Sequence, residues 1–180
     1  MLTGPTAFPV LGGLLVDAVL ARFRANGVTI PQTYGVVPAP DVWDDCSCGQ
    51  LAVAFTRISP SVNGQIEAFG ADTGTGLPAG PTVTMPTPPF LLGELQVAML
   101  RCADTSGDPS SETLAREAAE VHADAYWTTL AVVCELKRLR EAGEIEDYQL
   151  RDQPFLPAAG GCQGAQINAA VAINLNCPCD

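Results

Sequence analysis

Residues 166–175 read Gln-Ile-Asn-Ala-Ala-Val-Ala-Ile-Asn-Leu, and this stretch decides the fold. Every odd position in it is apolar, whereas positions 166, 168 and 174 carry amides and positions 170 and 172 carry alanine. Alternation with a period of two is typical of a β-strand that packs one face on a core and leaves the other face polar or nearly bare. A short strand from Asp147 and a Pro/Gly-rich turn precede it, so the sequence predicts a β-hairpin over residues 147–175.

A long helix is predicted directly before this hairpin. It opens at Asp108-Pro109, runs to about Ala142 and ends at Gly143. Glu112 near its start and a cationic cluster near its end complement the helix dipole. The cationic residues are Lys137, Arg138 and Arg140. The apolar stripe expected to face the core consists of Leu114, Ala118, Val121, Ala125, Leu130, Val133 and Cys134.

The N-terminal part contains a first helix at residues 9–26, followed by irregular chain. Pro9 suits the first helical turn, and Asn26-Gly27 provides a left-handed stop. The helically spaced residues are Leu11, Leu14, Leu15, Ala18, Val19, Arg22 and Phe23. Residues 28–49 are predicted to be irregular, because their three prolines block continuous β-ladders. These prolines are Pro31, Pro38 and Pro40.

Strands are predicted on both sides of a Pro/Gly-rich segment. Residues 51–56 alternate Leu, Val and Phe with Ala, Ala and Thr, and a turn joins them to a further strand at 65–69. Residues 94–102 resume the alternation. Residues 70–90 are rich in Gly, Pro and Thr and are predicted to form a projecting arm.

The whole pattern predicts a single α+β domain over residues 1–180. Its sheet is expected to be mixed and largely antiparallel, with two main helices on one face and an arm at about 70–90. The chain length suits one domain with a substantial core.

The charge excludes some classes of function. Nine basic and twenty acidic residues give a net charge of −11, which argues against binding of nucleic acid by phosphate neutralisation and against an anionic membrane surface. No targeting segment is evident, because the first basic residue is Arg22 and Asp17 interrupts the N-terminal apolar run. We therefore expect the protein to be made, and to stay, in the cytoplasm.

Seven cysteines invite a metal or disulfide interpretation. Cys46, Cys48, Cys177 and Cys179 form two Cys-x-Cys pairs. We favour thiols at strand ends over a zinc site, because one intervening residue holds paired sulfurs poorly for a tetrahedron. Cys102 and Cys134 are expected to be small core residues. Cys162 lies in a glycine turn and could pair with any nearby thiol, but nothing in the sequence selects its partner. Free thiols are the first expectation in a reducing compartment.

The sequence contains no pattern that demands an enzyme. Asp72-Thr73-Gly74 matches the aspartic-protease tripeptide, but that chemistry needs two facing copies and an apolar strand before each. We interpret it as a turn. His122 is the only histidine and lies within the long helix, where a surface or packing role is expected. We predict no catalytic residues, no metal and no cofactor.

The order of helix, strands, arm, strand, long helix and hairpin resembles the tail-terminator proteins of long-tailed phages, and several segments resemble the versions in actinobacterial phages. These segments are residues 43–53 (Trp-Asp-Asp-Cys-Ser-Cys-Gly-Gln-Leu-Ala-Val), the strand from Glu94 to Cys102, and residues 160–164 (Gly-Gly-Cys-Gln-Gly). The resemblance covers most of the chain, although the arm is longer than the minimal fold needs.

The resemblance implies a structural virion protein without enzymatic activity. Such proteins form a hexameric ring that caps the finished tail tube, stops its growth and joins the tail to the head-completion (neck) proteins. The ring would assemble in the host cytoplasm and remain in the virion, with genomic DNA passing through the lumen. An acidic lumen would let DNA slide without specific binding, and tight retention of DNA at low salt would refute this expectation.

Two alternatives remain at this stage. Another neck protein is possible, but a connector is expected to be mainly helical and a stopper mainly β-barrel. A zinc- or thiol-dependent enzyme or a protease is less favoured. Zinc content after reduction and the effect of Asp72→Asn on peptidase activity would distinguish these classes.

Overall fold

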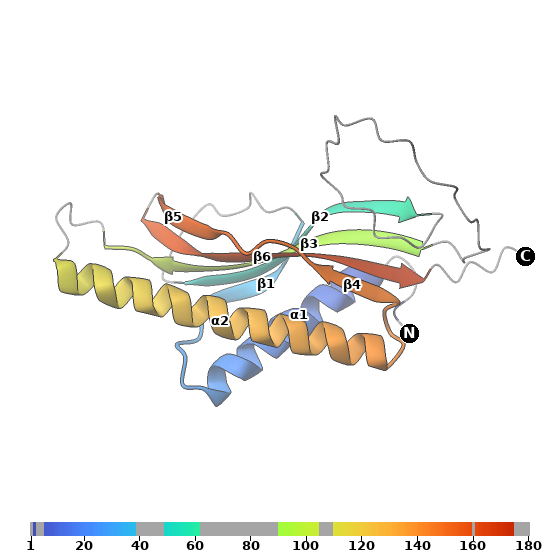
Figure 1. Cartoon of the computed structure of the whole chain (residues 1–180), viewed down its shortest axis with the longest axis horizontal. Helices are drawn as coiled ribbons and strands as arrows, with labels where there is room; N and C mark the ends of the chain where they lie inside the picture. Colours follow the sequence, from blue (N-terminus) through green and yellow to red (C-terminus); the bar gives the residue numbers. More distant parts are fainter. Residues whose placement is uncertain are drawn as a thin grey trace, which may run out of the picture.

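The computed structural model describes residues 2, 6–38, 49–61, 90–104, 110–159 and 161–174, which form two helices and six strands (Figure 1). In chain order the elements are α1 (Ala7–Ala25), β1 (Thr33–Val37), β2 (Gln50–Ser61), β3 (Phe90–Cys102), α2 (Ser111–Glu141), β4 (Asp147–Leu150), β5 (Phe155–Ala159) and β6 (Cys162–Asn174).

All six strands belong to one sheet with the order β1-β2-β3-β6-β4, and β5 pairs with β6 beside β4. β1 is parallel to β2, whereas the other pairings are antiparallel. Both helices lie on the same side of this sheet (Figure 1). The predicted α+β fold, with two helices on one face of a mixed, largely antiparallel sheet and a closing helix and hairpin, is confirmed.

The core lies between the helices and the odd-numbered positions of the central strands. Leu95 and Val97 of β3 lie opposite Ala169 and Ile167 of β6, and all four are buried. Successive strand residues point to opposite faces, so the alternation in the sequence places these side chains under the helices. The helices contribute the buried residues Leu11, Leu15, Val19, Phe23, Val132, Leu136 and Leu139. Full burial of each such leucine or phenylalanine stabilises the fold by roughly 1.5–3 kcal/mol.

Gly93 in β3 sets how closely α1 approaches the sheet. A Cβ atom built at Gly93 would lie 2.2 Å from Cε1 of Phe8. The Phe8 ring also packs against Phe55 of β2, with 5.1 Å between ring centroids. The first turn of α1 therefore rests on β3 where only glycine leaves enough space.

The face of the sheet without helices carries several alanines together with the buried Leu92 and Leu100 of β3. Ala52, Ala54, Ala98, Ala170 and Ala172 alternate with the core residues of their strands and are buried. The sequence predicted a face that is polar or nearly bare. The alanines are small, as predicted, but they are shielded from solvent.

The long helix α2 begins one residue after its N-cap, Ser110, whose Oγ accepts a hydrogen bond from the Thr113 backbone N–H at 3.1 Å. The predicted apolar stripe is correct at Val121 and Ala125 but wrong at the exposed Leu114 and Ala118 and in the second half of the helix. There the buried residues are Ala131, Val132, Leu136 and Leu139, whereas Leu130 and Val133 are partly exposed and Cys134 is exposed. The hydrophobic pattern alone predicted the wrong buried face for this half of α2, because the polar residues Asp124 and Thr128 are also buried.

Two strands lie where irregular chain was predicted. β1 fits between Pro31 and Pro38, which flank its ladder and do not interrupt it. β5 and the first residue of β6, Cys162, occupy the predicted Pro/Gly turn. The predicted strand at 65–69 and the arm at 70–90 lie outside the described residues, apart from Phe90, which begins β3.

Candidate functional site

The two sequence motifs that suggested chemistry fall outside the described residues. These are the cysteines Cys46, Cys48, Cys177 and Cys179 and the tripeptide that begins at Asp72. Within the described part of the chain, no group of three or more His, Cys, Asp and Glu side chains is arranged to hold a metal ion.

The described cysteines differ from the predictions. Cys102, at the end of β3, and Cys134, on α2, are exposed thiols, so their predicted core role is wrong. Cys162 lies opposite Cys102 in the β3–β6 ladder and takes part in a disulfide bond. The sequence had left pairing of Cys162 with a nearby thiol open, although free thiols were the first expectation. Cys102 and Cys162 are therefore opposite each other in the ladder, the first as a thiol and the second in a disulfide bond.

His122 has the surface and packing role that the sequence predicted. It is exposed on α2, and its ring packs edge-on against Phe155 of β5 with 4.8 Å between centroids. Gln153 Nε2 donates a hydrogen bond to the backbone oxygen of Ala125 at 3.2 Å. These contacts fix α2 alongside the β4/β5 edge of the sheet.

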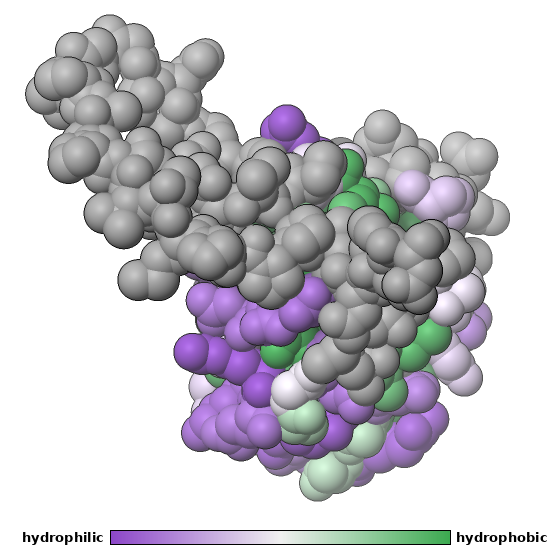
Figure 2. All heavy atoms as spheres, turned by 90° about the vertical axis from the view of Figure 1, so that its right-hand side faces the viewer, coloured by the Kyte–Doolittle hydropathy of each residue, from purple (hydrophilic) through white to green (hydrophobic). Residues whose placement is uncertain are grey.

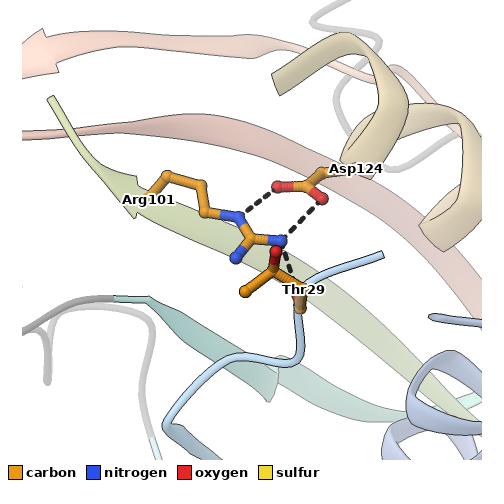
Figure 3. Close-up of polar contacts among 3 residues, drawn as sticks. All are labelled: Thr29, Arg101 and Asp124. Atoms are coloured by element: carbon orange, nitrogen blue, oxygen red, sulfur yellow. Dashed lines mark hydrogen bonds and ion pairs between the residues drawn. The ribbon is translucent and has the colours of Figure 1, made fainter. Parts of the chain in front are cut away.

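A buried ion pair joins three segments that are distant in the sequence (Figure 3). Arg101 Nε donates to Asp124 Oδ2 at 2.6 Å, and its Nη2 donates to Asp124 Oδ1 at 2.8 Å and to the backbone oxygen of Thr29 at 2.7 Å. The end of β3, the middle of α2 and the link between α1 and β1 are therefore tied together. Bidentate charge-assisted hydrogen bonds of this kind are strong and directional.

This ion pair is suited to holding structure and not to proton transfer. Both carboxylate oxygens of Asp124 accept hydrogen bonds from one guanidinium, a group that carries only donors. The sequence analysis did not identify the pair, because only apolar residues were used to predict the buried face of the long helix. A usable signal exists: Asp124 and Thr128 lie three and seven residues after Val121, in phase with the buried face.

A pocket of about 330 Å³ lies beside β2, β3, β6 and the link that follows β4. Its described lining residues are Thr56, Glu94, Leu95, Arg151, Asp152, Asn168 and Ala169. Asn168 Nδ2 donates to Asp152 Oδ1 at 2.9 Å, and Asn168 Oδ1 accepts from Gln166 Nε2 at 2.7 Å. Two carboxylates and one guanidinium suit the binding of a small polar or cationic group. None of the described lining residues is a histidine, serine or cysteine.

The two outer edges of the sheet carry exposed apolar side chains. On the β1 edge, Tyr34 is 51% and Val36 is 39% exposed. On the opposite edge, Leu150 of β4 is 38% and Phe155 of β5 is 50% exposed, and Tyr126 of the adjacent helix α2 is 60% exposed. Aromatic side chains at this exposure are enriched in protein interfaces.

The end of the molecule where α2 stops has a different character. Figure 2 shows this end, where hydrophilic residues dominate the lower part of the coloured surface. The last turns of α2 carry the ion pairs Lys137–Glu141, Arg138–Glu135 and Arg140–Asp147. The hydrogen bond that Arg138 donates to the Glu135 carboxylate raises the pKa of Arg138 above its ordinary value. Large apolar side chains are also exposed outside the two edges, at Val10 of α1, Ile58 of β2 and Leu114 of α2.

A scan of the chain against models of known protein families finds no match, and a search of curated proteins finds none either. Neither of the two described helices is both long enough and apolar enough to cross a membrane.

Proposed function

We propose that the chain is a tail terminator of a long-tailed phage. Copies of it form a hexameric ring on the end of the tail tube, terminate tube growth and join the tail to the head-completion proteins. The fold agrees with what the resemblance in the sequence implies, namely a single sheet with two helices on one face and a closing hairpin.

The observation that carries this proposal is the pair of apolar edges on opposite sides of one sheet. A ring requires two different surfaces on each subunit, because each copy contacts one neighbour on either side. The β1 edge and the β4/β5 edge are different surfaces of this kind, and each exposes at least one aromatic side chain. A protein that functions as a monomer does not require two exposed apolar edges.

The other neck proteins fit this architecture less well. A connector is expected to be mainly helical and a stopper mainly β-barrel, whereas this chain packs two helices on an open sheet. The enzyme alternatives draw no support from the described residues, whose best-formed polar cluster is the structural Arg101–Asp124 pair.

The proposed partners are other copies of the chain, the tail tube protein and the neck proteins. Genomic DNA passes through the lumen without specific binding, as expected for a ring whose subunits each carry a net charge of −11. The protein assembles in the host cytoplasm and stays in the virion. It needs no metal, no cofactor and no membrane for this role.

Purified chain added to polymerising tail tube protein is expected to stop the growth of the tubes. The measurement is the tube length distribution by electron microscopy, as the ratio of chain to tube protein is raised. Mean length falls as the ratio rises, and one tube end carries a ring. Heat-denatured chain is the control, and lengths that do not change with added native chain contradict the proposal.

A further inference from the structure

We infer that the β1 edge of one copy pairs in antiparallel fashion with the β4/β5 edge of the next copy, so that Tyr34 and Val36 pack against the neighbour's α2. This inference rests on the proposed ring and specifies which surfaces close it. The occupant of each edge is a second copy of this chain.

The first surface is the side of β1 with which none of the described strands pairs. Tyr34 and Val36 lie opposite Leu51 and Val53 of β2 in the parallel ladder, so their side chains share the face covered by the helices. Gly12 of α1 approaches this strand so closely that a Cβ there would lie 2.8 Å from Val36 Cγ2. β1 reads Thr-Tyr-Gly-Val-Val and carries no charged residue. Edge strands of proteins that remain monomeric usually carry lysine, proline or a bulge to prevent pairing. β1 carries none of these, whereas Pro157 and a bulge between Leu156 and Ala159 in β5 leave β4 as the part of the second edge that can form the ladder.

The second surface is the side of β6 where β4 and β5 follow one another. Leu150 lies opposite Ala169 and Phe155 opposite Ala165, so these side chains also lie on the helix-covered face. Above them runs an uncharged stripe of α2 at alternating spacings of four and three residues. Its members are Ala115, Ala119, His122, Tyr126, Thr129 and Val133. The His122–Phe155 contact and the Gln153 hydrogen bond to Ala125 show that this side of α2 overlooks the edge.

Strand direction makes the two surfaces complementary. β1 is parallel to β2, and the chain of antiparallel pairings from β2 through β3 and β6 leaves β4 and β5 opposite to β1. Joining the two edges of neighbouring copies therefore gives an antiparallel ladder, which forms more readily than a parallel one. The exposed apolar residues of both edges lie on the same face of the sheet. The apolar layer between helices and sheet therefore continues from one copy to the next across this contact, which we call the junction. The contact joins two different surfaces and is therefore heterologous. Its repetition closes a ring when the rotation between neighbouring copies divides a full turn into whole steps.

The test uses Tyr34→Lys and Tyr126→Lys, one on each surface, with Val10→Lys as a control. Val10 is 46% exposed on α1 and belongs to neither surface, and all three side chains are exposed enough for the variants to fold. Native mass spectrometry of the wild-type chain is expected to show a ring, and each tyrosine variant alone is expected to be monomeric. We expect each to weaken association by at least about tenfold, as for aromatic residues at interface centres. Val10→Lys should retain the ring.

A mixture of the two tyrosine variants gives the decisive result. Each pair of unlike variants retains one intact junction, so the mixture should form dimers and nothing larger. A wild-type chain that stays monomeric, a ring that survives either tyrosine variant, or equal loss of the ring in Val10→Lys overturns the inference. If the mixture forms dimers but the wild-type ring does not arrest tail tubes, the junction is correct and the proposed function is wrong. If both tyrosine variants still form the ring and that ring still arrests tubes, the junction is wrong and the function stands.

Discussion

Replacement of Asp124 by alanine is expected to lower the free energy of unfolding by about 3–5 kcal/mol, because removing one partner of a buried ion pair leaves the other charge uncompensated. The Asp124 side chain is 4% exposed and the Arg101 side chain 13% exposed, so water cannot replace the lost carboxylate fully. The substitution also frees the end of β3 from α2. Chemical denaturation followed by circular dichroism measures the effect.

The matched control is Glu120→Ala, one helical turn earlier on the exposed side of α2. It should change stability by less than about 0.5 kcal/mol, as surface substitutions usually do. Asp124→Asn retains one acceptor oxygen and is expected to fall between the two. A loss below about 1 kcal/mol in Asp124→Ala would mean that the ion pair contributes no more than an ordinary surface pair.

Gly164→Ala is expected to cost about 3 kcal/mol or more, at the upper end of what overpacking of a core costs. A Cβ at Gly164 would lie 2.0 Å from the backbone oxygen of Met99 and 3.0 Å from Cα of Leu100. These atoms belong to β3, the central neighbour of β6, and backbone cannot move aside as a side chain can. The two central strands would have to separate locally.

Gly13→Ala provides the control for this prediction. Gly13 lies within α1, and a Cβ there would meet nothing within 4 Å. Alanine favours a helix interior by roughly 0.5–1 kcal/mol relative to glycine, so this variant should be more stable than the wild type. Thermal unfolding of the two variants should therefore shift in opposite directions. A Gly164→Ala protein as stable as the wild type would refute the close approach of β3 and β6.

The sequence was most informative where one period dominated the pattern. Alternation at residues 166–174 and 94–102 predicted β6 and β3, and Gly27 and Gly143, both with positive φ, mark the ends of the two helices as predicted. The boundaries of β1 were missed, because prolines on both sides suggested irregular chain. An edge strand such as β1 pairs with a neighbour on one side only, and the local sequence does not reveal this.

The buried polar residues and the exposed residues of the sheet edges were harder to predict from the sequence. Asp124 becomes a core residue only because Arg101, more than twenty positions away, meets it across the helix–sheet boundary. The placement of Tyr34 and Phe155 on opposite edges follows only from the strand order. Strand order depends on long-range pairing, which neither composition nor periodicity specifies.

The central claim is that this chain ends the growth of a tail tube, and electron microscopy of a phage lysate tests it most directly. The lysate comes from a phage in which the gene for this chain carries an early stop codon, with a lysate complemented by the intact gene as the control. We predict full heads separate from tails of uncontrolled, excessive length. Tails of normal length beside empty or leaking heads would contradict the account and assign the protein to the head side of the neck.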